Sequence, residues 1–248
     1  MHFARFALTL SPVMQVIYED NHVIIVAKQS GEIVQGDKTG DRPLSETVKD
    51  YIKQKYQKPG AVFLGVVHRL DRPVSGLVVF ARTSKALSRL NDMFRLGQVH
   101  KTYWAIVATP SQGRCDGGRA VMDGQWHELE HWLVRNEQQN KSYAYDHEVP
   151  RSKHAVLRYR PIGRSERYTL LEVQLLTGRH HQIRCQLAAM GCPIRGDLKY
   201  GARRSNPDGS ISLLSRRVEF VHPVSKELIT AESPLPDDPL WEAFGGKK

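Results

Sequence analysis

The sequence predicts an α+β fold organised around a mixed, largely antiparallel sheet, and three observations support this. Short strand-like apolar runs outnumber the helical patterns along the chain. The helical patterns interrupt the strands irregularly, without the regular strand–helix alternation of a parallel sheet. No internal repeat, low-complexity tract or linker composition divides the chain. We therefore expect one domain over residues 14–248, preceded by a flexible leader over residues 1–13.

The first half combines a hairpin with two amphipathic helices. Two apolar runs are split by a Glu-Asp-Asn turn signal, which predicts antiparallel strands. Apolar residues then recur twice at helical spacing, and each pattern ends at a glycine. In order, we expect strands at 15–18 and 22–27, a helix at 45–57, and a helix capped by Thr83 or Ser84 and closed by Gly97.

The second half is predominantly strand-like. Its segments alternate apolar and polar residues and are separated by polar or glycine-rich connections. One helical pattern, at 178–190, places Ile183, Leu187 and Met190 on one face. We expect strands at 100–107, 129–134, 142–147, 155–161, 169–176, 211–220 and 228–231, and polar loops at 111–118 and 201–209.

The charge balance favours a polyanionic partner. The 248 residues carry a net charge of +10, while the hydrophobic fraction of 40% is ordinary for a globular protein. A basic surface suits nucleic acid first and an anionic membrane second. No apolar run approaches the roughly 20 residues that cross a bilayer. We therefore expect a nucleic-acid partner and no membrane insertion.

Cysteine usage indicates a reducing compartment. The three cysteines include no Cys-x-x-Cys pair, and their odd number argues against a disulfide framework. The mildly apolar N-terminus is short, is interrupted by Arg5, and lacks a cleavage site of small residues. These features predict a cytoplasmic protein, with Met1 and Met14 both open as the true start.

The least generic stretch is 68–76, HRLDRPVSG. A single carboxylate, Asp71, lies between Arg69 and Arg72, and valine-rich segments flank the stretch. Pro73 and Gly76 predict a loop that opens into a buried strand. Flanking positive charge favours the ionised carboxylate, which is the state that a nucleophile or a general base requires. The simpler interpretation is a surface ion pair at the entrance of a strand.

Four segments in order resemble the RluA family of pseudouridine synthases. They are HRLD at 68–71 followed by SGL at 75–77, KTYWA at 101–105, TGRHHQIR at 177–184 and PIRGD at 193–197. The likeness extends over about residues 15–230. It implies a long mixed sheet flanked by helices and loops, with an active-site cleft across the sheet.

The resemblance assigns catalytic roles to Asp71, Tyr103 and Arg184. The family breaks the bond from C1′ to N1 of uridine and joins C1′ to C5 of the same base, so no cofactor or metal is implied. Asp71 would attack C1′, add to C6 or take the ribose 2′-proton, and these alternatives stay open. Arg184 would pair with Asp71 and orient it. Tyr103 would stack on the uracil and assist proton removal at C5.

The resemblance also suggests where the RNA binds. The target uridine must leave its stack before a carboxylate can reach it, and Arg69 would fill the vacated space. His181 is a further candidate RNA contact. Arg72, Arg179, Arg195 and Lys199 are expected around the cleft as phosphate-binding residues. The expected substrate is ribosomal or transfer RNA, bound by a monomer with no obligate protein partner.

Three other interpretations compete with this one. His127, Glu128 and His131 match the H-E-x-x-H zinc signature, but that motif needs a helix, and this segment reads equally well as a strand in a hairpin. A second cluster, His180, His181 and Cys185, could also bind metal. A non-catalytic RNA-binding module would satisfy the charge, although it would not need a carboxylate, a tyrosine and an arginine at these family positions.

Small departures from the family pattern accompany the match. Val74 stands where the family often has threonine, which removes a hydroxyl near the site. Lys28 is followed by Gln29 where the family usually has proline. Cys185 and Gln186 replace the more usual valine and histidine, so any role of that histidine is absent.

Overall fold

The computed structural model describes residues 14–109 and 124–245, and in these ranges one 11-stranded sheet runs through the molecule. The main strand order is β1-β2-β4-β10-β5-β9-β8-β6-β7, with β11 beside β10 and β3 beside β4. Every pairing is antiparallel except that of β10 with β4. The predicted α+β class and largely antiparallel sheet are therefore confirmed.

The strands are β1 (Gln15–Glu19), β2 (Val23–Lys28), β3 (Gly65–Val66), β4 (Ser75–Ala81), β5 (His100–Ala108), β6 (His127–Asn136), β7 (Lys141–Tyr145), β8 (Lys153–Arg164), β9 (Tyr168–Leu175), β10 (Leu213–Val221) and β11 (Leu228–Glu232). The helices are α1 (Leu44–Lys55), α2 (Ser84–Arg95), α3 (Gln182–Ala189), the single 3₁₀ turn η1 (Leu198–Tyr200) and α4 (Pro239–Gly245).

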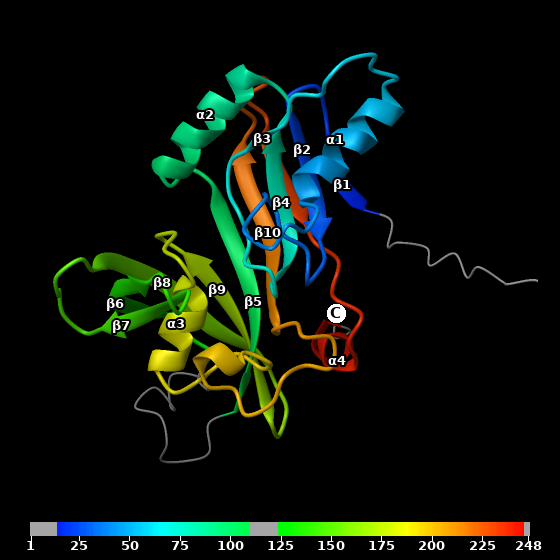
Figure 1. Cartoon of the computed structure of the whole chain (residues 1–248). Coiled ribbons are helices and arrows are strands. Elements are labelled where there is room, and N and C mark those ends of the chain that lie inside the picture. The colour runs from blue at the N-terminus through cyan, green and yellow to red at the C-terminus, as the bar shows by residue number, and fades with distance from the viewer. Residues whose placement is uncertain (1–13, 110–123, 246–248) are drawn as a thin grey trace, which may run out of the picture.

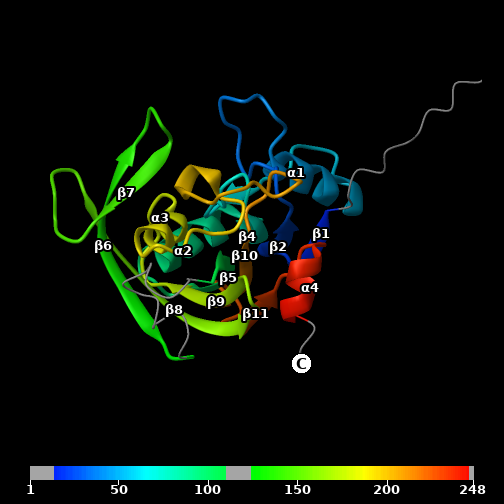
Figure 2. The same cartoon turned by 90° about the horizontal axis from the view of Figure 1, so that it is seen from below.

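The sheet carries two groups of elements joined along β5 and β10 (Figure 1). One group holds β1, β2 and β4 with α1 and α2, and the other holds β6 to β9 with α3. α1 and α2 cover opposite faces of β2 and β4, because they pack against alternate residues of these strands. α3 and α4 likewise pack against opposite faces of β5 and β9, and Figure 2 shows α3 beside β6 and β7, away from α4. The face of β5 on the α3 side, which carries Tyr103, is the central face of the sheet.

Apolar packing fixes the strands that surround this central face. β2 is buried at all six positions, and six of the seven residues of β4 are buried as well. Such continuous apolar runs are typical of strands covered on both faces. A second cluster contains Val74, which precedes β4, Tyr103 of β5 and Ile183 of α3. Three segments distant in sequence thus share one core beneath the central face.

The third helix differs from its prediction. It begins at Gln182 rather than 178, because His181 has a left-handed backbone with φ of 53° and stops the helix from extending backwards. Its first six residues are all buried, so it has no solvent face of the predicted amphipathic kind. Arg184 therefore lies in the interior instead of at the edge of an apolar face.

The other predicted elements agree with the structure to within a few residues. Thr83 is the N-cap of α2, and its Oγ1 accepts a hydrogen bond from the Ala86 N–H at 3.2 Å. The elements β3, η1 and α4 were not predicted. The expected leader at 1–13 and the loop at 111–118 lie outside the described residues. In the part of the chain that the structure describes, no helix is long and apolar enough to span a membrane.

Candidate active site

Asp71 lies in a tight loop between β3 and β4. The loop closes with a hydrogen bond of 3.0 Å from the Val74 N–H to the Asp71 carbonyl. It leads into Gly76, whose φ of +114° and close approach to β10 leave no room for a side chain, since a Cβ would lie 2.4 Å from the Ser215 carbonyl oxygen. The glycine therefore lets β4 and β10 pair in parallel directly behind the carboxylate.

A buried lysine at the end of β2 fixes this loop from below. The Lys28 ammonium donates to the carbonyls of Gln29, Arg72 and Val74 at 2.9, 3.1 and 2.6 Å. Burial lowers the pKa of Lys28 to about 8. The sequence analysis assigned Lys28 no function. A lysine at the end of an apolar strand of six residues could have indicated a buried cation. Lys28 holds the backbone on both sides of Pro73.

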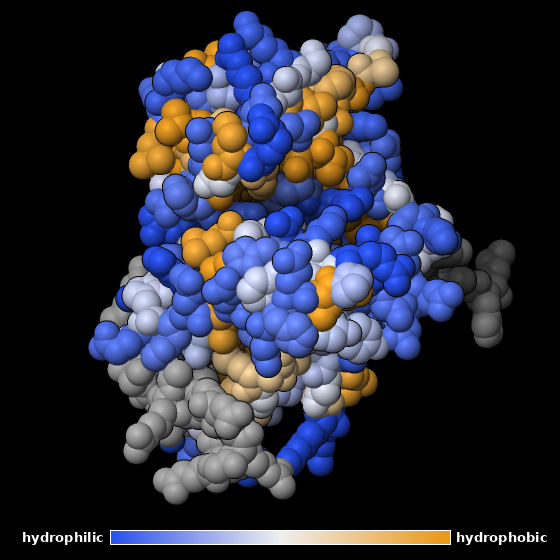
Figure 3. All heavy atoms as spheres, turned by 90° about the vertical axis from the view of Figure 1, so that its left-hand side faces the viewer, coloured by the Kyte–Doolittle hydropathy of each residue, from blue (hydrophilic) through white to orange (hydrophobic). Residues whose placement is uncertain are grey.

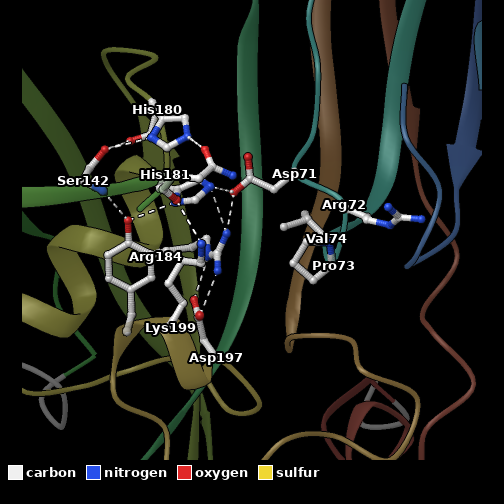
Figure 4. Close-up of polar contacts among 12 residues, drawn as sticks. Asp71, Arg72, Pro73, Val74, Ser142, His180, His181, Arg184, Asp197 and Lys199 are labelled. Carbon is white, nitrogen blue, oxygen red and sulfur yellow. Dashed lines mark hydrogen bonds and ion pairs between the residues drawn. The ribbon is translucent and has the colours of Figure 1, made fainter. Parts of the chain in front are cut away.

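Arg184 connects Asp71 to a second carboxylate. Its Nη1 donates to Asp71 Oδ2 at 3.0 Å, which is the pairing that the sequence analysis expected (Figure 4). Its Nε and Nη2 form a two-pronged contact with Asp197 at 2.7 and 2.8 Å. Burial alone would lower the pKa of Arg184, but its hydrogen bonds with Asp197 and Asp71 raise it overall. The guanidinium is therefore always charged and fixed in orientation.

The role of Asp197 was missed in the sequence. Its side chain is only 1% exposed, while that of Asp71 is 30% exposed at the opposite edge of the same guanidinium. The available signal was its place in the segment 193–197, where one carboxylate follows apolar residues and a glycine. Asp197 balances the charge of Arg184, and Asp71 remains open to solvent.

His181 also faces the carboxylate. Its Nε2 lies 3.4 Å from Asp71 Oδ2 and 3.2 Å from Arg184 Nη1, and its Nδ1 is 3.0 Å from the Tyr200 hydroxyl. Burial, reinforced by the charge of Arg184, lowers the pKa of His181 to about 2, so the imidazole is neutral. The Tyr200 hydroxyl accepts a hydrogen bond of 2.8 Å from the Ser142 N–H. His181 therefore forms part of the wall behind Asp71 and is 8% exposed.

Tyr103 lies on β5 and lines the same cleft as Asp71. It is 6% exposed, and its hydroxyl is hydrogen-bonded to Ser215 of β10. Burial raises the pKa of Tyr103, and the nearby charge of Asp71 adds to this effect. The phenol is therefore protonated at neutral pH. Tyr103 and Asp71 line one cleft, and the stacking role expected for the tyrosine stays a prediction.

The cleft that contains these residues has a volume of about 980 Å³. Segments from both halves of the sheet line it, including 66–71, 94–103 and 175–184. Among the described residues, its lining includes six arginine and lysine side chains but a single carboxylate, that of Asp71. Figure 3 shows a face of the molecule that is hollowed across its middle and largely hydrophilic around the hollow. The cleft suits a polyanion with one reactive carboxylate at its base.

The predicted RNA contacts divide into two groups. Arg69, Arg179 and His181 line the cleft, and Arg69 is exposed. Arg72, Arg195 and Lys199, which were expected around the cleft, are not among the described residues that line it.

Each of these three cations is occupied elsewhere. Arg72 points away from Asp71 and pairs with Asp41 (Figure 4), while Arg195 pairs with Asp238 at 3.0 Å. The Lys199 ammonium donates to the carbonyls of Gln139 and Asn140, both at 3.1 Å. Arg184, rather than a flanking arginine, therefore supplies the positive partner of Asp71.

The structure also resolves the zinc alternative. His127 to His131 lie in β6, not in a helix, so the spacing that a helical zinc motif requires is lost. No group of three or more histidine, cysteine, aspartate or glutamate side chains in residues 14–109 and 124–245 could hold a metal ion. His180 and Cys185 instead contact Ser142 of β7.

The arrangement defines the chemistry available at the site. One carboxylate, oriented by a permanent cation and partly open to solvent, lies beside a neutral phenol and a neutral imidazole. Such a carboxylate can act as a nucleophile or as a base, and the described residues of the cleft lining include no second carboxylate that could share acid–base work with it. The site fits a reaction in which one aspartate acts on a substrate carried by a polyanion.

Comparisons with known proteins agree with this chemistry. Residues 22–189 match the RNA pseudouridylate synthase family. Ribosomal large subunit pseudouridine synthase D of Xanthomonas campestris pv. campestris is 32% identical over 91% of this chain and 67% of the relative. Ribosomal large subunit pseudouridine synthase C of Vibrio cholerae serotype O1 is 31% identical over 89% and 65%, respectively. This chain thus spans about two thirds of the length of these relatives.

A solved structure supports the fold. Human RNA Pseudouridylate Synthase Domain Containing 4 aligns with a TM-score of 0.68 and 20% identity, covering 90% of this chain and 89% of its own. The mitochondrial pseudouridylate synthase RPUSD4 of Xenopus tropicalis is 32% identical over 90% of this chain and 72% of the relative. The fold, the cleft and these matches together show that the chain belongs to the RNA pseudouridylate synthase family, the enzymes that isomerise uridine to pseudouridine in RNA.

Proposed function

We propose that this chain converts specific uridines of ribosomal RNA to pseudouridine, with Asp71 as the reacting group and without a cofactor. The observation that carries the proposal is the ion-pair chain from Asp197 through Arg184 to Asp71, which ends at the one carboxylate among the described cleft residues. The printed names of two relatives specify the large ribosomal subunit, and this favours ribosomal over transfer RNA as the substrate.

The reaction balances without any added reagent. The bond from C1′ to N1 breaks, a bond from C1′ to C5 forms, C5 loses a proton, and N1 gains one. Asp71 either bonds to C1′ while the uracil turns, or takes the ribose 2′-proton and later returns it. In both routes Arg184 keeps the carboxylate charged and directed at the ribose, because the opposite edge of its guanidinium is held by Asp197.

Proton removal at C5 falls to a group other than Arg184. A guanidinium donates but does not accept protons at neutral pH. The Tyr103 hydroxyl contacts Ser215, and its raised pKa keeps the phenol protonated, so that no phenolate is available as a base at neutral pH. We therefore assign Tyr103 the role of a stacking surface whose hydroxyl passes a proton, and not that of a free phenolate.

The remaining assignments extend the same proposal. Residues 14–248 act as one catalytic domain in the cytoplasm, and the chain works as a monomer. Arg69, exposed at the rim of the cleft, takes the place of the uridine that leaves its stack, while Arg179 contacts a phosphate beside it. The charge of the cleft lining supports both assignments.

Pseudouridine mapping tests this proposal. Total RNA from cells with and without the gene is labelled with a carbodiimide that marks pseudouridine and is read by reverse transcription. We expect at least one ribosomal position to lose its signal, to recover it with the wild-type gene, and to stay unlabelled with Asp71→Asn. An unchanged map would refute the proposed activity, and a change confined to transfer RNA would refute the ribosomal substrate.

A further inference from the structure

Lys101 is a cation of the cleft that lies in the matched segment 101–105 but has no role in the mechanism above. It is the second residue of β5, and its side chain is partly buried. Its ammonium lies 5.5 Å from the centre of the Phe94 ring and 3.9 Å from the position that a Cβ on Gly178 would occupy. The ammonium therefore lies between the end of α2 and the loop that precedes α3.

The ammonium has no charge partner within residues 14–109 and 124–245. In those ranges no hydrogen bond or ion pair involves its Nζ, which lies over the Phe94 ring and whose charge acts on the nearby His68. The other cations behave differently, since Arg184 is held by two carboxylates and Arg72 by one. Burial without a counter-ion lowers the pKa of Lys101. An anion placed there would offset this cost.

Strand geometry relates Lys101 to the position of the substrate base. Residues 101 and 103 are two apart on β5, so their side chains lie on one face about 7 Å apart. Both line the cleft. Tyr103 provides the flat surface proposed for the uracil, and a nucleotide carries its phosphates on the far side of the ribose from the base. The strand β5 thus carries the Tyr103 ring for the base and the Lys101 ammonium two residues away.

The neighbouring groups favour an anion at this position. The side chains that surround Lys101 in the cleft include His68, Arg95 and His100, and none of them is acidic. Burial lowers the pKa of His68 to about 3, so that imidazole is neutral. Asp71, the one carboxylate of the described lining, is already paired with Arg184.

We propose that the Lys101 ammonium binds a backbone phosphate that flanks the target uridine while Tyr103 contacts its base. This inference rests on the proposed function, because it takes the RNA of that reaction as the ligand. The contact is made before and during the reaction alike, so it strengthens RNA binding without adding to the chemical step.

The test uses synthetic RNAs that span the uridine found by mapping. In two versions, a neutral methylphosphonate replaces either the 5′ or the 3′ phosphate of that uridine. Affinity is measured by fluorescence anisotropy and turnover by carbodiimide labelling, for the wild type, Lys101→Gln and Lys101→Arg. Lys53→Gln, an exposed lysine of α1 outside the cleft lining, is the matched control.

We expect Lys101→Gln to bind unmodified RNA about tenfold more weakly, which corresponds to one charge-assisted hydrogen bond. One of the two methylphosphonates should weaken wild-type binding by the same factor and have no further effect on Lys101→Gln. Lys101→Arg should bind nearly as well as the wild type, and kcat should hold in all variants, since uniform binding changes KM alone.

Two results would overturn the inference. If both methylphosphonates weaken the wild type and Lys101→Gln equally, then the lysine contacts neither phosphate. If Lys101→Gln binds as tightly as Lys53→Gln, then its charge is not used. These outcomes are separate from the proposed function, because absence of wild-type turnover would refute the activity whereas the affinities decide the role of Lys101.

Discussion

Removal of the charge on Asp197 tests the ion-pair chain that runs through Arg184 to Asp71. Asp197→Asn keeps the size of the side chain and one acceptor oxygen, but leaves the Arg184 guanidinium with Asp71 as its one carboxylate partner. Loss of one partner of a buried ion pair costs about 3–5 kcal/mol. We expect the lower end, about 3 kcal/mol, because Asp71 at 3.0 Å still balances the charge.

The stability change can be measured by thermal unfolding. For a chain of this length, 1 kcal/mol shifts Tm by about 2–4 °C, so Asp197→Asn should lower Tm by about 6–12 °C. The control is Asp238→Asn, whose pair with Arg195 has a 3.0 Å contact in place of 2.7 Å for Asp197, but side chains 21% and 25% exposed. A more solvated pair contributes about 1 kcal/mol or less, which predicts a Tm shift below about 4 °C.

The kinetic consequence separates positioning from stability. Below the Tm of the variant, Arg184 can pivot once its two-pronged contact is lost, so Asp71 is less well oriented and the single-turnover rate should fall about tenfold. RNA affinity should be unchanged, because Asp197 is 1% exposed and lies outside the cleft lining. Two results together would contradict this: a Tm of Asp197→Asn equal to that of Asp238→Asn, and a single-turnover rate equal to that of the wild type. The ion-pair chain would then not orient Asp71.

Three further perturbations follow from the same geometry. Gly76→Ala places a Cβ 2.4 Å from the Ser215 carbonyl at a φ of +114°, so Tm should fall by at least about 6 °C, and a fall below 2 °C would contradict that packing. Lys28→Met removes three hydrogen bonds, two of which hold the Asp71 loop; calorimetry should show a loss of about 3 kcal/mol and labelling a reduced rate, and an unchanged rate would mean that the loop keeps its conformation without the lysine. His68, whose pKa is lowered from 6.5 to about 3, binds a proton in the unfolded chain but not in the native one between those values. The free energy of unfolding should therefore fall by about 1.4 kcal/mol for each unit of acidification below pH 6.5, and His68→Gln should reduce that slope in urea titrations; an unchanged slope would show that His68 is accessible to protons.

The sequence predicted the strands and the contact between Asp71 and Arg184. Alternating and continuous apolar runs mark β2, β4 and β5, because burial of a sheet leaves a direct trace in residue order. The contact between Asp71 and Arg184 spans 113 residues, and it was expected only because both lie in segments that resemble one family. Periodicity alone gave no indication of it.

The parts that sequence reasoning missed depend on contacts without a period. Lys28 bonds to carbonyls 44 and 46 residues away, and a carbonyl leaves no mark in the sequence. The helix at 178–190 was predicted too long because the left-handed backbone at His181 is stabilised by tertiary contacts with Tyr200 and Arg184. Arg72 was expected near the RNA since it adjoins Asp71, but neighbours in a loop can point in opposite directions (Figure 4).

The central claim is that Asp71 performs the chemistry and Arg184 supports it. The direct measurement is single-turnover formation of pseudouridine by purified Asp71→Asn on a synthetic RNA spanning the mapped uridine, together with its affinity for that RNA. Asparagine retains the shape of the side chain and can accept from Arg184, but it is neither a nucleophile nor a base. The account predicts RNA affinity within about threefold of the wild type and no detectable pseudouridine. Turnover by Asp71→Asn at the wild-type rate would contradict it.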